Sequence, residues 1–187
     1  MILVLGGARS GKSLLAEKLA SGKVAYVATG AALDDEMRER IRKHRARRPR
    51  GWRTFEQQLD LDKLAPKLTE EFDAIIIDCA TLYVTNIFLS RETGPATEGH
   101  VLAAIDRLVK ACSGTKATVI IVSNELGSGI VPENALARQF RDIMGFVNQR
   151  LAAAADEVYF TVAGIPMKIK PATRRAGKPA ADTNANG

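Results

Sequence analysis

Short apolar runs alternate along the chain with longer amphipathic stretches, a pattern typical of parallel strands joined by helices. Continuous apolar runs of four or five residues indicate strands buried on both faces of a sheet. These runs, with one shorter segment, predict strands over residues 2–5, 24–28, 53–55, 74–78 and 118–122. The sequence therefore predicts an α/β fold with a mostly parallel sheet, helices on both faces, and ligands at the carboxyl ends of the strands.

Helices are expected where apolar residues recur at a spacing of three or four. The first spans 13–20 and has Leu14, Leu15 and Leu19 on its buried side. Another spans 61–70, and a third is marked by Val101, Ile105, Leu108 and Cys112. A long helix then has Pro132 in its first turn, and its expected core positions are Leu136, Phe140, Ile143, Val147, Leu151 and Ala154. Residues 159–162 and 166–170, on either side of Gly164, predict a closing β-hairpin.

A further helix is expected between the second and third strands. Asp34 suits its N-cap, and Pro49 ends it. Its apolar positions, at helical spacing, are Leu33, Met37, Ile41 and His44. His44 therefore shares the apolar face, while the neighbouring arginines point to solvent.

Composition narrows the class of protein. Of 187 residues, 46% are hydrophobic, which suits one domain, expected over 1–170. Residues 171–187 contain no Val, Ile, Leu or aromatic residue and are expected to be a disordered tail. Charged residues at 26% and aromatics at 5% argue against a disordered protein and against an aromatic-rich carbohydrate or single-strand binder.

The thiols and the N-terminus indicate a compartment. Cys79 and Cys112 lack metal-ligand spacing and are expected to be reduced thiols. The apolar N-terminus is only five residues long and lacks a charged leader region, so neither a signal peptide nor a membrane span is expected there. These features predict a cytoplasmic protein without membrane insertion.

Positive charge is concentrated in one segment. The net charge is +6, but the segment 36–53 alone carries nine cations against two acids, which leaves the other residues at −1. Such a segment implies an anionic ligand, either a nucleotide or a nucleic-acid backbone, although it also suits a solvated helix face. Trp52 is the one aromatic residue in this segment, and this weakens the nucleic-acid interpretation because single-strand binders stack bases on aromatic rings.

The strongest chemical signal lies directly after the first strand. Residues 6–13 satisfy the pattern G-x-x-x-x-G-K-[ST] and precede a helix, as in a P-loop. Backbone N–H groups of such a loop converge on phosphate oxygens at the positive end of the helix. Lys12 would reach the β- and γ-phosphates, and the hydroxyl of Ser13 would bind Mg²⁺. The expected phosphate-binding residues are Gly6, Gly7, Ala8, Arg9, Ser10, Gly11, Lys12 and Ser13.

Acidic residues follow two of the buried strands. Asp78 has the position of the Mg²⁺ carboxylate of P-loop proteins, with a helix N-cap as the alternative. Glu125 has two interpretations: it could help to bind a metal or act as a base, or it could serve only as a cap.

His44 has two interpretations. A lone histidine on an apolar helix face is often a packed core residue. Yet nearby guanidinium groups disfavour the imidazolium form, and this would leave His44 neutral and nucleophilic while the arginines stabilise charge on an attacked phosphate. His100 has no such surroundings and is expected at the surface.

Several motifs together resemble the bifunctional adenosylcobinamide kinase/adenosylcobinamide-phosphate guanylyltransferase family of cobalamin biosynthesis. The resemblance runs from residue 1 to about residue 170. Besides residues 6–13, it rests on the motifs at 34–37, 52–56, 85–86, 124–125, 132–134, 137–142 and 148–149, and on His44 followed by Arg48 and Pro49.

The resemblance implies a RecA-like P-loop NTPase fold, a homotrimer, and two reactions. A nucleoside triphosphate would phosphorylate adenosylcobinamide, and GTP would then transfer GMP through a histidine to adenosylcobinamide phosphate. By position, His44 would be the guanylylated nucleophile. The nucleotide would be lined by residues 6–13 and by Thr29, Gly30, Ala31, Arg45, Ala46, Arg47, Arg48, Glu56 and Asp78. Ser13 and Asp78 would hold Mg²⁺, and GTP, or ATP for the kinase step, would be the nucleotide.

Two alternatives from other classes stay open at this point. One is a RecA-like nucleic-acid-binding ATPase that uses the basic segment as an arm. The other is a P-loop kinase of small molecules in which His44 is structural.

Overall fold

One seven-stranded sheet organises the computed structural model, which describes residues 1–30, 39, 42, 48–90 and 94–171. The strand order is β3-β2-β4-β5-β1-β6-β7. Neighbours from β3 to β6 are parallel, whereas β7 is antiparallel to β6. The strands are β1 (Ile2–Gly6), β2 (Val24–Ala28), β3 (Arg53–Glu56), β4 (Ala74–Asp78), β5 (Thr118–Asn124), β6 (Glu157–Val162) and β7 (Ile165–Lys170).

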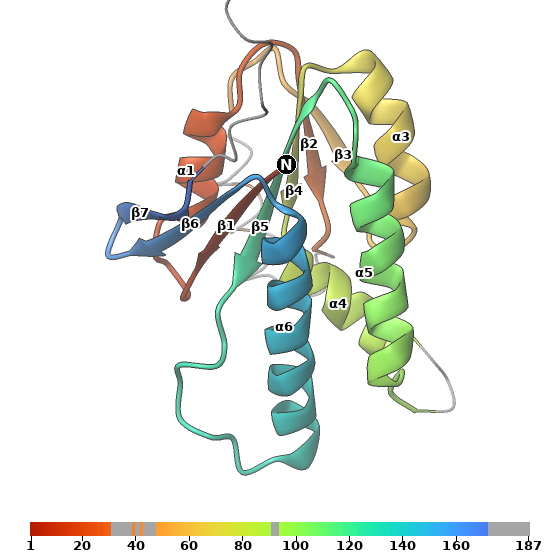
Figure 1. The fold of residues 1–187 in the computed structure, drawn as a ribbon, viewed down its shortest axis with the longest axis vertical. Helices are drawn as coiled ribbons and strands as arrows, with labels where there is room; N and C mark the ends of the chain where they lie inside the picture. Colours follow the sequence, from red (N-terminus) through yellow and green to blue (C-terminus); the bar gives the residue numbers. More distant parts are fainter. Residues whose placement is uncertain (31–38, 40–41, 43–47, 91–93, 172–187) are drawn as a thin grey trace, which may run out of the picture.

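Helices cover both faces of this sheet (Figure 1). One face is covered by α1 (Lys12–Leu19). The other carries α3 (Leu61–Glu71), α4 (Ala80–Leu89), α5 (Glu98–Cys112) and α6 (Ala135–Ala154). The expected mostly parallel α/β sheet with a C-terminal hairpin is therefore confirmed.

Alternate residues of the central strands supply two cores, one on each face. Val4, Tyr26 and Ile76 face α1 and pack with Ala16 in the smaller core. The larger core lies under α3, α5 and α6 and includes Leu3, Ile75, Ile77, Ile121, Leu108 and Val147. Because both faces are buried, these strands contain the continuous apolar runs that the sequence showed.

The start of α6 differs from the expectation. The placement of Pro132 in the first turn is wrong, because the helix begins at Ala135 and Asn134 is its N-cap, whose side chain accepts a hydrogen bond from the N–H of Ala137 at 3.0 Å. The carbonyl of Pro132 instead accepts a hydrogen bond from Nη1 of Arg138 at 3.0 Å, which folds the preceding loop back onto the helix.

Three expected core positions are also wrong. Leu136 is 42% exposed because the first turns of α6 extend beyond the sheet (Figure 1), and Ala154 is exposed at the other end of the helix. Leu14 is 46% exposed, because α1 buries Lys12 and Ala16 instead. Helix α4 was not expected at all: its mostly apolar sequence has no polar stripe to reveal a helical period.

Other expectations are confirmed, and some lie outside the described residues. Both cysteines are free and buried, and His100 is exposed. The helix expected around His44 and the tail from 172 onward lie outside the described part of the chain. Within that part, no helix combines the length and the apolar character needed to cross a bilayer.

Candidate functional site

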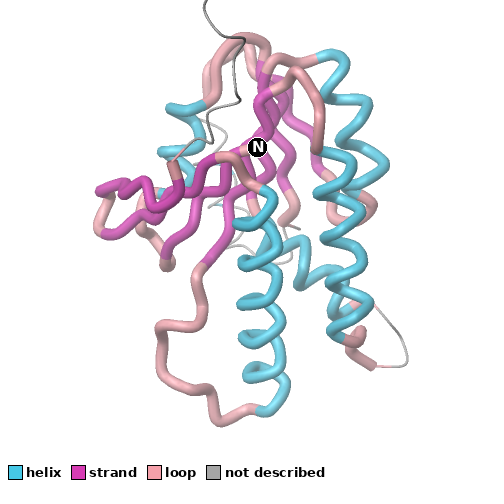
Figure 2. Tube along the Cα trace, viewed as in Figure 1, coloured by secondary structure: helices cyan, strands magenta, loops and turns pink. Residues whose placement is uncertain are grey.

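The carboxyl ends of six parallel strands share one edge of the sheet. The last residues of β1 to β5 are Gly6, Ala28, Glu56, Asp78 and Asn124. Neighbouring strands lie about 4.8 Å apart, and only β5 separates β1 from β4. The sheet therefore brings the segments after these strands, which were predicted separately from the sequence, to a common edge. The loop 125–134 that follows β5 extends beyond this edge (Figure 2).

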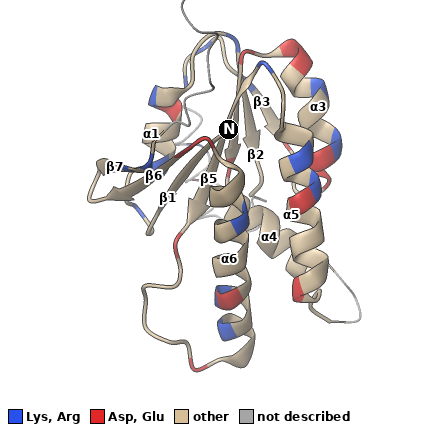
Figure 3. Ribbon diagram, in the orientation of Figure 1, with Lys and Arg blue, Asp and Glu red and all other residues tan. Residues whose placement is uncertain are grey.

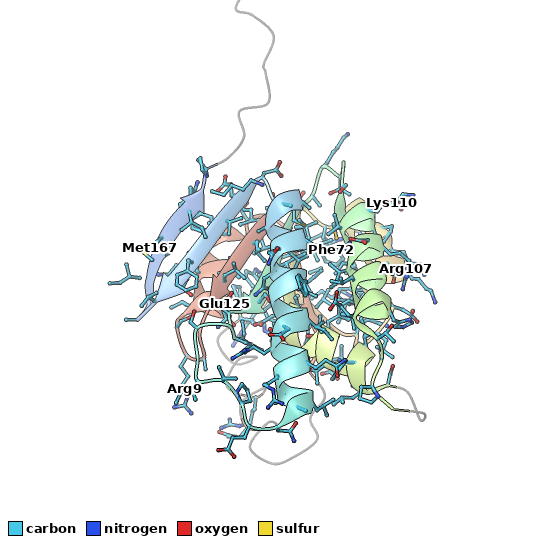
Figure 4. All side chains as sticks on the ribbon, turned by 60° about the horizontal axis from the view of Figure 1, so that its bottom comes forward. Arg9, Phe72, Arg107, Lys110, Glu125 and Met167 are labelled. Atoms are coloured by element: carbon cyan, nitrogen blue, oxygen red, sulfur yellow. The ribbon has the colours of Figure 1, made fainter. Side chains whose placement is uncertain are left out.

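The predicted phosphate loop connects β1 directly to α1. Arg9 and Gly11 adopt positive φ angles of 56° and 98°, which turn the backbone sharply before the helix. Lys12 begins α1 and is 8% exposed, and its Nζ donates a hydrogen bond to the carbonyl of Gly7 at 2.5 Å. The ammonium group thus lies across the loop, where a cation would neutralise phosphate. In Figure 4 the side chain of Arg9 points outward at the tip of this loop.

Asp78 is held by a tyrosine of the neighbouring strand. Tyr26 is almost completely buried, and its hydroxyl donates a hydrogen bond to Oδ2 of Asp78. Burial, and secondly the Asp78 carboxylate, raise the pKa of Tyr26 far above its usual value, so the phenol stays protonated. Cys79, not Asp78, occupies the N-cap position of α4, and this geometry rules out the cap as the role of Asp78.

Arg48 covers the same tyrosine. Its guanidinium carbon lies 3.5 Å from the centre of the Tyr26 ring, a cation–π contact, and its Nη1 donates to Oγ1 of Thr54 at 3.0 Å. Nε of Arg48 is buried and has no hydrogen-bond partner among the described residues. A cation with unused donor capacity therefore lies over the ring of the tyrosine that binds Asp78.

Thr29 links β2 to the segment after β4. Its side chain is fully buried, and its hydroxyl donates to the carbonyl of Cys79 at 2.7 Å and accepts from the N–H of the same residue at 2.8 Å. The side-chain amide of Asn86 donates to the carbonyl of Thr29 at 2.9 Å. Gly30 follows, and a Cβ there would lie 3.0 Å from Cδ1 of Leu82. These contacts fix the backbone of 29–30 against α4.

Glu125 lies beside the phosphate loop at the end of β5 (Figure 4). Its backbone N–H donates to the carbonyl of Gly6 at 3.0 Å. Its Oε1 accepts from the N–H of Gly127 at 2.7 Å, and its Oε2 from the amide of Asn148 at 3.4 Å. One carboxylate oxygen thus stabilises the turn after β5 and the other joins Glu125 to α6, which favours a structural role for this residue.

The structure brings most of the predicted site residues together. Residues 6–13, 29–30, 56 and 78 lie on or just after the strands of the common edge, and Arg48, which precedes β3, is stacked over Tyr26 of β2. Ala31, His44, Arg45, Ala46 and Arg47 lie outside the described residues. Sequence reasoning missed Tyr26 as the partner of Asp78. A tyrosine inside a fully buried strand is the signal that could have revealed it, because its hydroxyl requires a polar partner.

Away from the site, on α3 and α5, the charged side chains are of both signs. In Figure 3, acidic and basic residues are interspersed along α3 and α5, where Nε of Arg107 pairs with Oδ2 of Asp62 at 3.2 Å. The excess of positive charge thus stays with the segment 36–53, which precedes and enters β3.

A phosphate loop connects the first strand to the first helix of this mostly parallel sheet, and Asp78 ends β4, which only β5 separates from β1. This arrangement defines a P-loop nucleotide-binding α/β protein. The family model described as cobinamide kinase / cobinamide phosphate guanyltransferase matches residues 2–169. The chain belongs to this family, and it is therefore an enzyme of cobalamin biosynthesis with paired kinase and guanylyltransferase activities. This membership confirms the resemblance and decides against the nucleic-acid-binding ATPase.

Similar proteins span almost the whole chain. The chain is 51% identical over 180 residues to the bifunctional adenosylcobalamin biosynthesis protein CobU of Salmonella typhimurium, covering 91% of this chain and 99% of that protein. It is 48% identical to CobU of Escherichia coli, with the same coverage. It is 42% identical over 172 residues to CobP of Pseudomonas aeruginosa, covering 90% of this chain and 96% of that protein.

Among solved structures, the chain is similar to the P4 protein from bacteriophage phi6 in complex with ADP. The TM-score is 0.45 at 16% identity, and the match covers 89% of this chain and 53% of the other.

Proposed function

We propose that this enzyme phosphorylates adenosylcobinamide and then transfers GMP from GTP, through a guanylylated His44, to adenosylcobinamide phosphate. The observation that carries the proposal is the phosphate loop with Lys12 at the same sheet edge as Asp78, in a chain of this family. In the first reaction the substrate hydroxyl attacks the γ-phosphorus of ATP or GTP. The bond to the β-phosphate oxygen breaks, the nucleoside diphosphate leaves, and the hydroxyl proton is released.

In the second reaction, GMP passes from one anion, GTP, to another, adenosylcobinamide phosphate, and a covalent intermediate divides this transfer into two displacements. A ring nitrogen of His44 attacks the α-phosphorus of GTP with its lone pair, and the bond to the β-phosphate oxygen breaks, which releases pyrophosphate. A phosphate oxygen of adenosylcobinamide phosphate then attacks the same phosphorus. The nitrogen–phosphorus bond breaks, His44 is regenerated, and adenosylcobinamide-GDP forms. The cations Arg45, Arg47 and Arg48 would reduce the repulsion between the reacting anions.

The nucleotide would lie along the edge between the phosphate loop and Arg48. Residues 6–13 would bind its phosphates, and Thr29 to Ala31, Arg45 to Arg48, Glu56 and Asp78 would line the remainder. Two features of the described residues support this arrangement. Thr29 and Gly30 are fixed against α4, and the buried Nε of Arg48 has a donor to offer a ligand.

The donor set at the edge fits Mg²⁺. The hydroxyl of Ser13 and the carboxylate of Asp78 are hard oxygen ligands, which Mg²⁺ takes together with phosphate oxygens and water. Bound there, Mg²⁺ would neutralise phosphate charge. The hydrogen bond from Tyr26 would keep the carboxylate oriented toward the ion.

We further propose a cytoplasmic homo-oligomer, a trimer by analogy with the family. In its support, β7 is an edge strand whose alternate residues Ile165, Met167 and Ile169 are 66%, 47% and 59% exposed. Figure 4 shows Met167 pointing away from the body of the molecule. A row of apolar side chains on an unpaired edge strand is a common site of association. Light scattering of the wild type and of Met167→Glu would test this, and a wild-type monomer would contradict it.

Product analysis tests the reaction sequence. The protein is incubated with adenosylcobinamide, GTP and Mg²⁺, and the products are identified by mass spectrometry. We expect adenosylcobinamide-GDP from the wild type, adenosylcobinamide phosphate alone from His44→Ala, and neither product from Lys12→Ala. If His44→Ala also forms adenosylcobinamide-GDP, the covalent route is wrong and His44 is structural.

A further inference from the structure

The C-terminal hairpin packs directly against the phosphate loop. The N–H of Gly164, in the turn between β6 and β7, donates to the carbonyl of Ser10 at 3.0 Å. Thr161 of β6 is 2% exposed, and its Oγ1 donates to the carbonyl of Leu5 at 3.1 Å. The same Oγ1 lies 2.8 Å from Oγ of Ser10. Three polar contacts thus join the loop and the strand before it to a hairpin at least 151 residues further along the chain.

The direction of these hydrogen bonds follows from the number of protons. A hydroxyl has one proton to donate, and a carbonyl oxygen can only accept. Because the proton of Thr161 is used on the carbonyl of Leu5, the bond between the two hydroxyls requires Ser10 to be the donor. The proton of the Ser10 hydroxyl therefore points to β6.

The glycines of the loop show how close the hairpin lies. A Cβ on Gly6 would lie 2.5 Å from both the carbonyl oxygen and Oγ1 of Thr161, and a Cβ on Gly11 would lie 3.2 Å from Cα of Gly164. A Cβ on Gly7 would have no atom within 4 Å. The hairpin, and not the ligand alone, therefore explains why two of the motif positions are glycine.

We propose that Thr161 is a positioning residue for nucleotide binding: through Ser10 and Leu5 it holds the phosphate loop in the shape that receives the triphosphate. The inference rests on the proposed binding of GTP by this loop. Phosphate binding by backbone N–H groups depends on a preformed loop. Without the hydroxyl of Thr161, Ser10 has no acceptor and the carbonyl of Leu5 loses a donor, so the loop can leave this shape.

Thr161→Val tests the proposal, because it replaces the hydroxyl by a methyl group of similar size in a strand that tolerates valine. The readout is the Kd of a fluorescent GTP analogue with Mg²⁺, together with the Tm of each variant. We expect the Kd to rise about tenfold or more in Thr161→Val and to stay within about threefold of the wild type in Thr161→Ser. Ser123→Ala is the matched control: it removes a buried strand hydroxyl that donates to Asn148 at 2.7 Å, on the opposite face of the sheet. It should lower the Tm but leave the Kd unchanged.

A double-mutant cycle adds a second test. Ser10→Ala cuts the same bond from the loop side, so its effect and that of Thr161→Val should not add in the double variant. A folded Thr161→Val protein that binds GTP like the wild type would overturn the proposal, as would single effects that add fully. If Thr161→Val does not fold, Ser10→Ala decides by its Kd. A wild type that binds GTP but never carries GMP on a histidine would contradict the proposed function while leaving this comparison valid.

Discussion

The hydroxyl of Tyr26 on β2 donates a hydrogen bond to the carboxylate of Asp78 on the adjacent strand β4. Tyr26 pairs in register with Ile76, two residues before Asp78, so both side chains lie on the face of the sheet that α1 covers. One carboxylate oxygen is thus fixed by a buried phenol that stays protonated.

Tyr26→Phe should weaken Mg²⁺ binding without preventing folding. Loss of the hydrogen bond frees the Asp78 carboxylate to rotate, and partners of metal ligands typically contribute a factor of about ten or more in affinity. We expect the Mg²⁺ concentration for half-maximal GTP binding to rise about tenfold. Tyr83→Phe is the control, since Tyr83 is buried in the larger core. Equal Mg²⁺ dependence in both variants would show that Asp78 needs no partner or binds no metal.

Arg48→Lys should weaken nucleotide binding, although it keeps the positive charge. The planar guanidinium stacks on the Tyr26 ring and donates to Thr54 at the same time, and a lysine ammonium cannot do both. We expect the Kd for GTP to rise about fivefold to tenfold, since each tenfold is about 1.4 kcal/mol. Isothermal titration calorimetry measures it, with Arg50→Lys, an exposed member of the same segment, as the control. A wild-type Kd in Arg48→Lys would remove Arg48 from the site.

Gly6→Ala should destabilise the protein more than Gly7→Ala does. At Gly6 the new methyl would overlap the backbone of Thr161 at a φ of 153°, whereas at Gly7 it would meet open space. We expect Gly6→Ala to lower the free energy of unfolding by about 1–3 kcal/mol, and Gly7→Ala to change it by less than about 1 kcal/mol. Urea unfolding measures both. Similar losses in the two variants would mean that the hairpin does not constrain the loop.

The two buried thiols should make the protein less stable at alkaline pH. Burial raises the pKa of Cys79 to about 11 and that of Cys112 to about 12, against about 8.5 in an unfolded chain. Above pH 8.5 the unfolded state releases thiol protons that the folded state keeps, so stability falls as pH rises toward 11. Urea midpoints at pH 8 and pH 10 measure this loss, which should be smaller in Cys112→Ala.

Burial should also protect the two thiols from alkylation. We expect iodoacetamide at pH 8 to alkylate neither cysteine until the protein is unfolded. Rapid labelling of the native protein would contradict this expectation.

The sequence predicted the elements that have a strong period or a fixed motif. The buried strands and the phosphate loop could be read directly, because continuous apolar runs and glycine spacing are local signals. Helix α4 could not, since a helix buried on most sides lacks the polar stripe that reveals its period. Pro132 was misplaced because Asn134, two residues later, supplies the better N-cap.

The contacts between residues of the site could be found only from the tertiary structure. Asp78 was proposed from its place at a strand end. A tyrosine in a buried strand signals only that the Tyr26 hydroxyl needs a polar partner; which partner it has, and the role of Thr161, depend on strand order and register. No local pattern places β6 beside β1, and only that pairing brings Thr161 to Gly6. The motif thus identified the phosphate loop, and the fold identified what holds it.

The most direct test of the account is whether GMP becomes attached to His44. The protein is incubated with Mg²⁺ and GTP labelled at the α-phosphate, denatured, and tested for label that is acid-labile and base-stable, as a phosphoramidate is. The account predicts label on the wild type, none on His44→Ala, and release of the label when adenosylcobinamide phosphate is added. Absence of label on a folded wild type that binds GTP, or label retained in His44→Ala, would contradict it.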